Sequence, residues 1–169
     1  MTLIGPKITA REAGMEDGDL HLVVNDQAEI AHLFLGDGTK LDSRPALARG
    51  QGSDTTWNLR YTDTPPGLWL GGQIYRDYNW RPDERTARMY GWFSIALSGL
   101  EDQERRFGRS GIMLHGGGSA LGARAWAPHQ PLIPTLGCIR MHNADMKKLV
   151  EEIDRRKATL FVSVYQEEA

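Results

Sequence analysis

Only one stretch of this 169-residue sequence carries the periodicity of a long helix, and that scarcity constrains the fold most. Asn143 is a good N-cap residue for this helix, and Asp145 puts a negative charge in its first turn, where the helix dipole favours it. Four apolar residues then recur at helical spacing and form one face: Met146, Leu149, Val150 and Ile153. We predict one main C-terminal helix over residues 143–157, followed by a strand over 159–165.

Short apolar runs between turn residues occupy the rest of the chain, which holds 19 glycines and 8 prolines. Residues 20–24 and 28–35 predict a hairpin around Asn25-Asp26. The segments that follow are expected to be a loop over 36–56, short strands within 57–74, an exposed loop or flap over 75–88, a buried strand over 89–97, a short helix over 100–107 and a strand over 110–115. The sum is a mostly β domain over residues 20–169, preceded by an irregular lead-in over 1–19.

Composition excludes several classes of protein. The length suits one domain, and 40% apolar with 25% charged residues is typical of a globular chain. A net charge of -2 lacks the basic footprint of nucleic-acid binding, and no apolar run is long enough for a membrane span. Cys138 is the only cysteine, so neither an intramolecular disulfide nor a multi-cysteine zinc site can form. We expect no metal and no cofactor.

The densest chemistry lies in residues 111–118 and 134–143. Strand alternation puts Met113 and His115 on one face. Glycines follow His115 directly, so we expect it to end the strand and to face a glycine-rich loop. A free thiol has a pKa of about 8.5, and a nearby imidazole would create the thiolate–imidazolium pair of a nucleophilic cysteine. The backbone N–H groups of Gly137 and Cys138 could both face a developing oxyanion.

These residues resemble the catalytic signature of the L,D-transpeptidases, the YkuD-like cysteine enzymes of peptidoglycan. The matching stretches are His115-Gly116 and Thr135-Leu136-Gly137-Cys138-Ile139-Arg140-Met141-His142-Asn143. A weaker family element, a turn before an aromatic-bearing strand, matches Thr64-Pro65-Pro66-Gly67-Leu68-Trp69. The resemblance covers roughly residues 20–166 and implies an L,D-transpeptidase-like β-sandwich or barrel.

The resemblance assigns roles within this site. Cys138 becomes the nucleophile and His115 the general base and acid, with the Gly116 carbonyl orienting the imidazole. Arg140 either frames the site or binds a substrate carboxylate, while Thr135 either bonds near the nucleophile or holds the turn. We count both among the substrate-binding candidates.

Aromatic residues are further substrate-binding candidates. Trp69, with Tyr75, Tyr78 and Trp80, either lines a glycan or peptide groove or packs in the core. Asn143 is expected to cap the helix rather than bind substrate, and the roles of His129 and His142 stay open.

The implied reaction is acyl transfer on peptidoglycan stem peptides. Cys138 attacks the carbonyl of the diaminopimelate–D-Ala bond and forms a thioester. The alternative is a secreted antibacterial effector of the same fold with L,D-carboxypeptidase or D-amino-acid exchange activity, which would have a cognate immunity protein as a partner. The site of action is the periplasm or cell wall. No signal peptide is visible in this sequence, which suggests either a dedicated secretion system or a trimmed chain.

Two departures from the family pattern bear on the site. Leu136 stands where the family often has a second histidine, so His115 is expected to act alone. The loop between His115 and Thr135 is slightly long and could reshape the acceptor side.

Rival interpretations fit less well. A lipase-like interpretation of His115-Gly116-Gly117-Gly118 needs a downstream Gly-x-Ser-x-Gly, which is missing. A sortase places its histidine and cysteine much further apart than these. A cell-wall-binding module without turnover would not need the His115/Cys138 pair.

Overall fold

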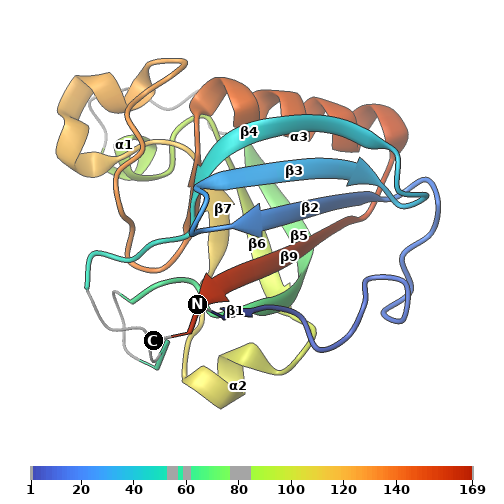
Figure 1. The fold of residues 1–169 in the computed structure, drawn as a ribbon. Coiled ribbons are helices and arrows are strands. Elements are labelled where there is room, and N and C mark those ends of the chain that lie inside the picture. The colour runs from blue at the N-terminus through green and yellow to red at the C-terminus, as the bar shows by residue number, and fades with distance from the viewer. Residues whose placement is uncertain (1, 53–56, 59–61, 77–84, 169) are drawn as a thin grey trace.

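Eight strands of the described chain close into a barrel, which confirms the predicted mostly β architecture (Figure 1). The computed structural model describes residues 2–52, 57–58, 62–76 and 85–168. The barrel strands are β2 (Leu20–Asn25), β3 (Ile30–Leu35), β4 (Lys40–Leu47), β5 (Gly67–Arg76), β6 (Phe93–Gly99), β7 (Met113–His115), β8 (Ile139–Met141) and β9 (Leu160–Glu167). They follow the order β9-β2-β3-β4-β8-β7-β6-β5, and β5 returns to β9. Closure gives each of the eight barrel strands a hydrogen-bonded neighbour on both sides.

Two neighbouring pairs in the barrel are parallel, and one of them positions the site. β2 runs parallel to β9, and β7 runs parallel to β8, while the other barrel pairs are antiparallel. In the second parallel pair Leu114 lies opposite Ile139 and His115 opposite Arg140. Residues next to each other on β7 and β8 therefore share a face of the sheet.

The main helix, α3 (Asn143–Arg156), lies beside the barrel and agrees with the prediction to within one residue (Figure 1). Its face of Met146, Leu149 and Val150 is buried in the core cluster that also contains barrel residues such as Leu22 and Val162. Lys157 adopts a left-handed conformation and ends the helix. The predicted short helix is α2 (Gln103–Phe107).

The clearest error of the sequence interpretation is the loop predicted over 36–56. Residues 40–47 form β4, which pairs with β3 and then, through Ala46 and Leu47, with β8. Its charged side chains and Pro45 hide the strand pattern, because most of β4 is half-exposed and only its last two residues are buried. Proline is tolerated here since it lies opposite Ile30, at the end of the β3 pairing.

Two further segments differ from expectation. Met89 was predicted in a strand but lies in the short helix α1 (Arg85–Tyr90), and β6 begins only at Phe93. The 75–88 segment is thus not one loop: β5 continues to Arg76 and α1 begins at Arg85, while 77–84 lie outside the described residues. The loop after β7 contains a 3-10 helix, η1 (Ser119–Trp126), which packs against α1 (Figure 1).

The lead-in is attached to the barrel. Leu3–Ile4 forms β1, which pairs with the end of β9 and brings the described ends of the chain together (Figure 1). The turns that follow bury Ala10 and Met15 against Leu68 and Phe161. Among the described residues, no helix is both long and apolar enough to cross a membrane.

Candidate active site

The parallel pairing of β7 and β8 brings the predicted nucleophile and base to one cavity. Leu114 and Ile139 point into the core, where both are fully buried. His115 and Arg140 occupy the alternate positions, and Cys138 directly precedes β8. His115, Cys138 and Arg140 all line a cavity of about 600 Å³. The strand register therefore assembles the site from residues 23 positions apart in the chain.

A backbone bond fixes the His115 ring. Nδ1 lies 2.7 Å from the carbonyl oxygen of Gly116, and because a carbonyl only accepts, Nδ1 carries the proton. Nε2 then holds the lone pair that a general base needs. The Tyr90 ring packs edge-on against the imidazole, with the ring centroids 5.1 Å apart. Burial, followed by the positive charge of Arg140, lowers the pKa of His115 to about 3, although the Gly116 bond acts in the opposite direction.

The thiol of Cys138 is held by the backbone of the preceding strand. The Met113 N–H donates to Sγ at 3.4 Å, and Sγ lies 3.7 Å from the Gly111 carbonyl oxygen. Burial raises the pKa of the Cys138 thiol, while the Met113 N–H and the charges of Arg140 and Arg109 lower it. These shifts favour a neutral thiol beside a neutral imidazole at rest, instead of the predicted thiolate–imidazolium pair.

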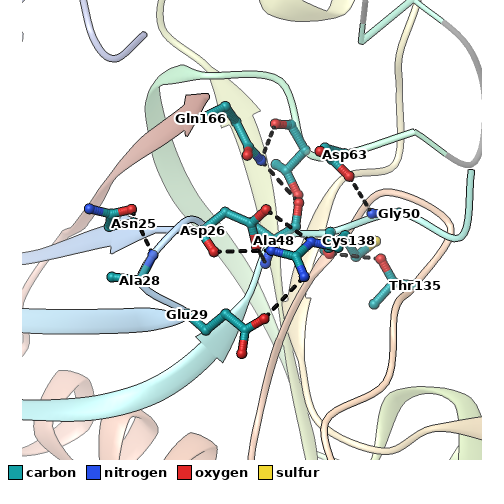
Figure 2. A network of polar contacts seen from close by, with 12 residues as sticks. Asn25, Asp26, Ala28, Glu29, Ala48, Gly50, Asp63, Thr135, Cys138 and Gln166 are labelled. Carbon is teal, nitrogen blue, oxygen red and sulfur yellow. Dashed lines mark hydrogen bonds and ion pairs between the residues drawn. The ribbon is translucent and has the colours of Figure 1, made fainter. Parts of the chain in front are cut away.

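Thr135 holds the turn that carries Cys138, as Figure 2 shows for the contact between these two residues. Its hydroxyl donates to the Cys138 carbonyl at 2.7 Å and accepts from the Gly137 N–H at 2.9 Å. The prediction that Gly137 offers its N–H to an oxyanion is therefore wrong, because that N–H is already bonded inside the turn. Thr64 secures the same turn by donating to the Gly137 carbonyl at 2.8 Å. Thr135 also lines the cavity, so its contact with substrate stays a prediction.

Two roles were predicted for Arg140, and its contacts fit the one in which it frames the site. Its guanidinium is buried and donates to the carbonyls of Ile133 at 2.6 Å, Pro134 at 3.3 Å and Gly116 at 3.3 Å. The Gly116 carbonyl is thus shared between Arg140 and the His115 ring. Burial lowers the pKa of Arg140 to about 10. Its contact with a substrate carboxylate stays a prediction.

Of the two roles predicted for Trp69, lining a groove or packing in the core, the structure shows the core position. Trp69 is 0% exposed, lies in the core cluster and donates its indole N–H to the Pro65 carbonyl at 3.1 Å. It cannot bind substrate, because β5 points it into the core. Tyr75 is exposed on the same strand, while Tyr78 and Trp80 lie outside the described residues.

A comparison with protein families and solved structures agrees with this geometry. The model of the L,D-transpeptidase catalytic domain, YkuD, matches residues 19–162. The chain belongs to this YkuD family. A comparison with curated proteins finds no match.

Solved structures share the YkuD fold. They include Bd1075 of Bdellovibrio bacteriovorus, with 19% identity and a TM-score of 0.58 over 93% of this chain and 52% of that one. The helical cell shape determining protein Pgp2 of Campylobacter jejuni has 17% identity and a TM-score of 0.59 over 94% and 54%. L,D-transpeptidase 1 of Mycobacterium tuberculosis has 13% identity and a TM-score of 0.50 over 86% and 61%. At such identities the likeness shows the fold alone, and this chain spans about half the length of the first two.

In this YkuD domain, Asn143 is neither a helix cap nor a substrate ligand. His142 occupies the N-cap position of α3 without a side-chain cap bond, and Asn143 is the first helical residue. The buried Asn143 amide accepts from the Gly117 N–H at 3.0 Å and donates to the carbonyls of Ala125 and Ala127 at 2.8 and 2.7 Å. Asn143 therefore fastens the loop after His115 to the helix after Cys138. The sequence alone could not reveal this role, because an asparagine near a helix start looks the same whether it caps the helix or fastens a distant loop.

His129 and His142 of the YkuD domain lie close to each other. His142 Nδ1 lies 2.8 Å from the Gln130 carbonyl oxygen, and its ring is 5.6 Å from that of the exposed His129. Neither lines the cavity. Leu136, at the position where a second histidine was expected from the family pattern, lines the cavity and is 42% exposed. Sequence reasoning passed over Tyr90 and Arg109, which also line the cavity; Tyr90 ends the short helix α1 and Arg109 lies in an irregular stretch, and neither belongs to a recognisable motif.

Proposed function

We propose that this protein is a cysteine acyltransferase that acts on peptidoglycan stem peptides, at the bond between diaminopimelate and D-Ala. The observation that carries the proposal is the shared cavity of Cys138 and His115, with the imidazole fixed through Nδ1 and its Nε2 lone pair left for the thiol proton. Membership of the YkuD family supports the peptidoglycan substrate.

In the first half-reaction, His115 Nε2 takes the thiol proton as Sγ of Cys138 attacks the carbonyl of the L-centre of diaminopimelate. Starting from a neutral pair suits a general base, because His115 is unprotonated at neutral pH. The tetrahedral oxyanion needs a donor, and the Cys138 N–H is the candidate that the turn leaves after Gly137 is excluded. The intermediate collapses as His115 returns the proton to the leaving nitrogen, which releases D-Ala and leaves a thioester.

In the second half-reaction, another nucleophile gives its proton to His115 and attacks the thioester, which restores the thiol. An amine of a second stem yields a cross-link, a free D-amino acid yields exchange, and water yields a trimmed tripeptide. Trimming or exchange would suit the antibacterial effector. The site of action is the periplasm or cell wall, where peptidoglycan lies.

Incubation with purified tetrapeptide muropeptides, with products read by mass, tests this function. Cross-linked dimers identify a transpeptidase, whereas tripeptides identify a carboxypeptidase and swapped tetrapeptides an exchange enzyme. Intact-protein mass should show an acyl-enzyme on Cys138. The proposal is wrong if no acyl-enzyme forms and no muropeptide changes.

A further inference from the structure

The cavity around Cys138 is lined by cations without matching anions. Its lining includes Arg85, Arg109 and Arg140 but no aspartate or glutamate among the described residues. Arg85 is exposed at the start of α1, whereas the other two arginines are buried. A pocket of this charge favours a ligand that carries a negative group.

Arg109 is the more unusual of the buried pair. It is 5% exposed, and its guanidinium donates to the Trp57, Thr62 and Asp63 carbonyls at 3.0 to 3.3 Å and to the Thr62 hydroxyl at 2.7 Å. These acceptors fix the guanidinium but carry no full charge. Arg109 forms no direct ion pair among the described residues; burial lowers its pKa, and the more distant charge of Asp63, whose carboxylate is bonded to the Gly50 N–H, only partly opposes this. A buried cation without a direct carboxylate contact is costly, and such groups cluster at functional sites.

The turn of the nucleophile is shaped to admit this guanidinium. Gly137 has φ +114, and a Cβ there would lie 1.7 Å from a terminal nitrogen of Arg109. Only glycine lets the arginine reach the residue that precedes Cys138. Arg109 thus reaches the turn that carries Cys138, while Arg140 uses its N–H groups on the carbonyls of Ile133, Pro134 and Gly116.

We propose that Arg109 binds the free carboxylate of the residue that leaves the donor peptide, a proposal that rests on the acyl-transfer function above. The leaving residue is C-terminal, so its carboxylate is joined to the scissile nitrogen through a single Cα. A cation beside the attacked bond therefore meets that carboxylate, and the Arg109 nitrogen next to Gly137, whose one bond among the described residues is to the Thr62 carbonyl at 3.3 Å, is the donor that lies at the turn. Arg109 makes the enzyme select stems that end at the leaving residue over longer or amidated ones.

The wild-type protein provides the first test. A tetrapeptide stem with a free terminal carboxylate is compared with the same stem as its terminal carboxamide. We expect kcat/KM to be about 10- to 100-fold higher for the acid, because a charge-assisted hydrogen bond is lost in the amide. Equal values for the two stems would overturn the carboxylate subsite and leave the acyl-transfer function intact, since turnover would have been seen.

Variants then locate the selection. Arg109→Gln should reduce the preference for the acid to about twofold or less, mainly through the acid substrate, whereas Arg109→Lys should keep part of it. The matched control is Arg105→Gln, an exposed arginine of α2 that should keep the full preference. A merely structural role for Arg109 would lower both substrates equally, and this outcome overturns the proposal. If Arg109→Gln fails to fold, the wild-type comparison and Arg109→Lys still decide.

A binding test separates the subsite from turnover. D-Alanine at millimolar concentration should slow iodoacetamide labelling of Cys138 in the wild-type protein and not in Arg109→Gln, and D-alaninamide should protect neither. Protection of both proteins alike, or of neither, would overturn the subsite even where no stem peptide reacts. Failure of turnover with Arg109-dependent protection would instead overturn the proposed function alone.

Discussion

Two regions meet at the cavity and are built on different principles. The strand pair, residues 113–115 and 138–141, brings Cys138 and His115 to one cavity through its register, because successive residues of paired strands alternate faces. The rim, which comprises the described residues of 57–66, 85–92 and 116–137, has no such repeat. Side chains from elsewhere fasten it, notably Asn143, Arg109 and Arg140. The strand pair thus carries the proposed reacting groups, and long-range polar bonds hold the rim.

This contrast predicts that substitutions in the two regions should have different effects on activity and on stability. In the strand pair, changing a cavity-facing residue removes a reacting group and leaves the ladder of backbone bonds in place. In the rim, changing a fastening residue leaves buried backbone groups without partners. Substitutions in the strand pair should therefore mainly lower activity, whereas substitutions in the rim should mainly lower stability.

The largest expected effect is that of Cys138→Ala. It should abolish acyl-enzyme formation and all change in muropeptides, because this is the only thiol of the chain. The free energy of unfolding should change by less than about 1 kcal/mol, since the side chain is small and partly exposed. Mass spectrometry and denaturant unfolding measure the two quantities. Retained turnover in this variant would break the comparison at its first step.

The second effect belongs to the base. His115→Ala should lower the acylation rate by roughly a thousandfold or more, as loss of one member of a catalytic unit does. The control is His129→Ala, because His129 is exposed and outside the cavity lining, and it should retain activity within about twofold. Single-turnover formation of the acyl-enzyme is the measurement. A large loss in the control with little loss in His115→Ala would reassign the base.

The third effect tests the rim. Asn143→Ala should cost about 3 kcal/mol of unfolding free energy, because the Gly117 N–H and the carbonyls of Ala125 and Ala127 lose their buried partner. Asn25→Ala is a matched control: that amide accepts one bond from Ala28 in an exposed turn and should cost less than about 1 kcal/mol. Urea denaturation gives both numbers. Equal losses would show that the Asn143 bonds do not hold the rim.

The smallest expected effect is the pH dependence of stability that arises from His115. His115 has a folded-state pKa of about 3, below its unfolded value of about 6.5. Between these values the unfolded chain binds more protons, so stability rises with pH and is lost as pH falls below 6.5. The expected loss from pH 6.5 to pH 5 is about 2 kcal/mol.

Unfolding at several pH values, in wild type and in His115→Gln, measures this term. The wild-type slope should be steeper than that of the variant, because the variant has no imidazole to protonate at this position. His21, whose pKa burial also lowers, adds to the slope in both proteins. Identical slopes would show that His115 does not resist protonation in the folded state.

Much of the strand pair and of α3 was predictable from sequence, because their signals are local. Alternation along 113–115 fixes which side chains share a face, and the recurrence of Met146, Leu149 and Val150 fixes the buried face of the helix. The residues of two motifs, His115-Gly116 and the stretch from Thr135 to Asn143, were sufficient to suggest the family.

Tertiary structure alone decided the rest. β4 is polar and proline-bearing, and becomes a strand because β3 and β8 flank it and closure of the barrel leaves no other partner for their backbones. Gly137 was predicted to offer its N–H to an oxyanion, but Thr135 accepts that N–H. Trp69 was a substrate-binding candidate, but β5 turns its side chain into the core.

The difference lies in the range of the interactions. The sequence by itself determined the periodic elements and suggested which groups react, since these signals depend on residues a few positions apart. Which buried polar group meets which partner depends on residues such as Arg109 and Thr62, 47 positions apart, or Asn143 and Gly117, 26 apart. Closure of the barrel determines these long-range contacts, because it fixes where the distant loops lie relative to one another.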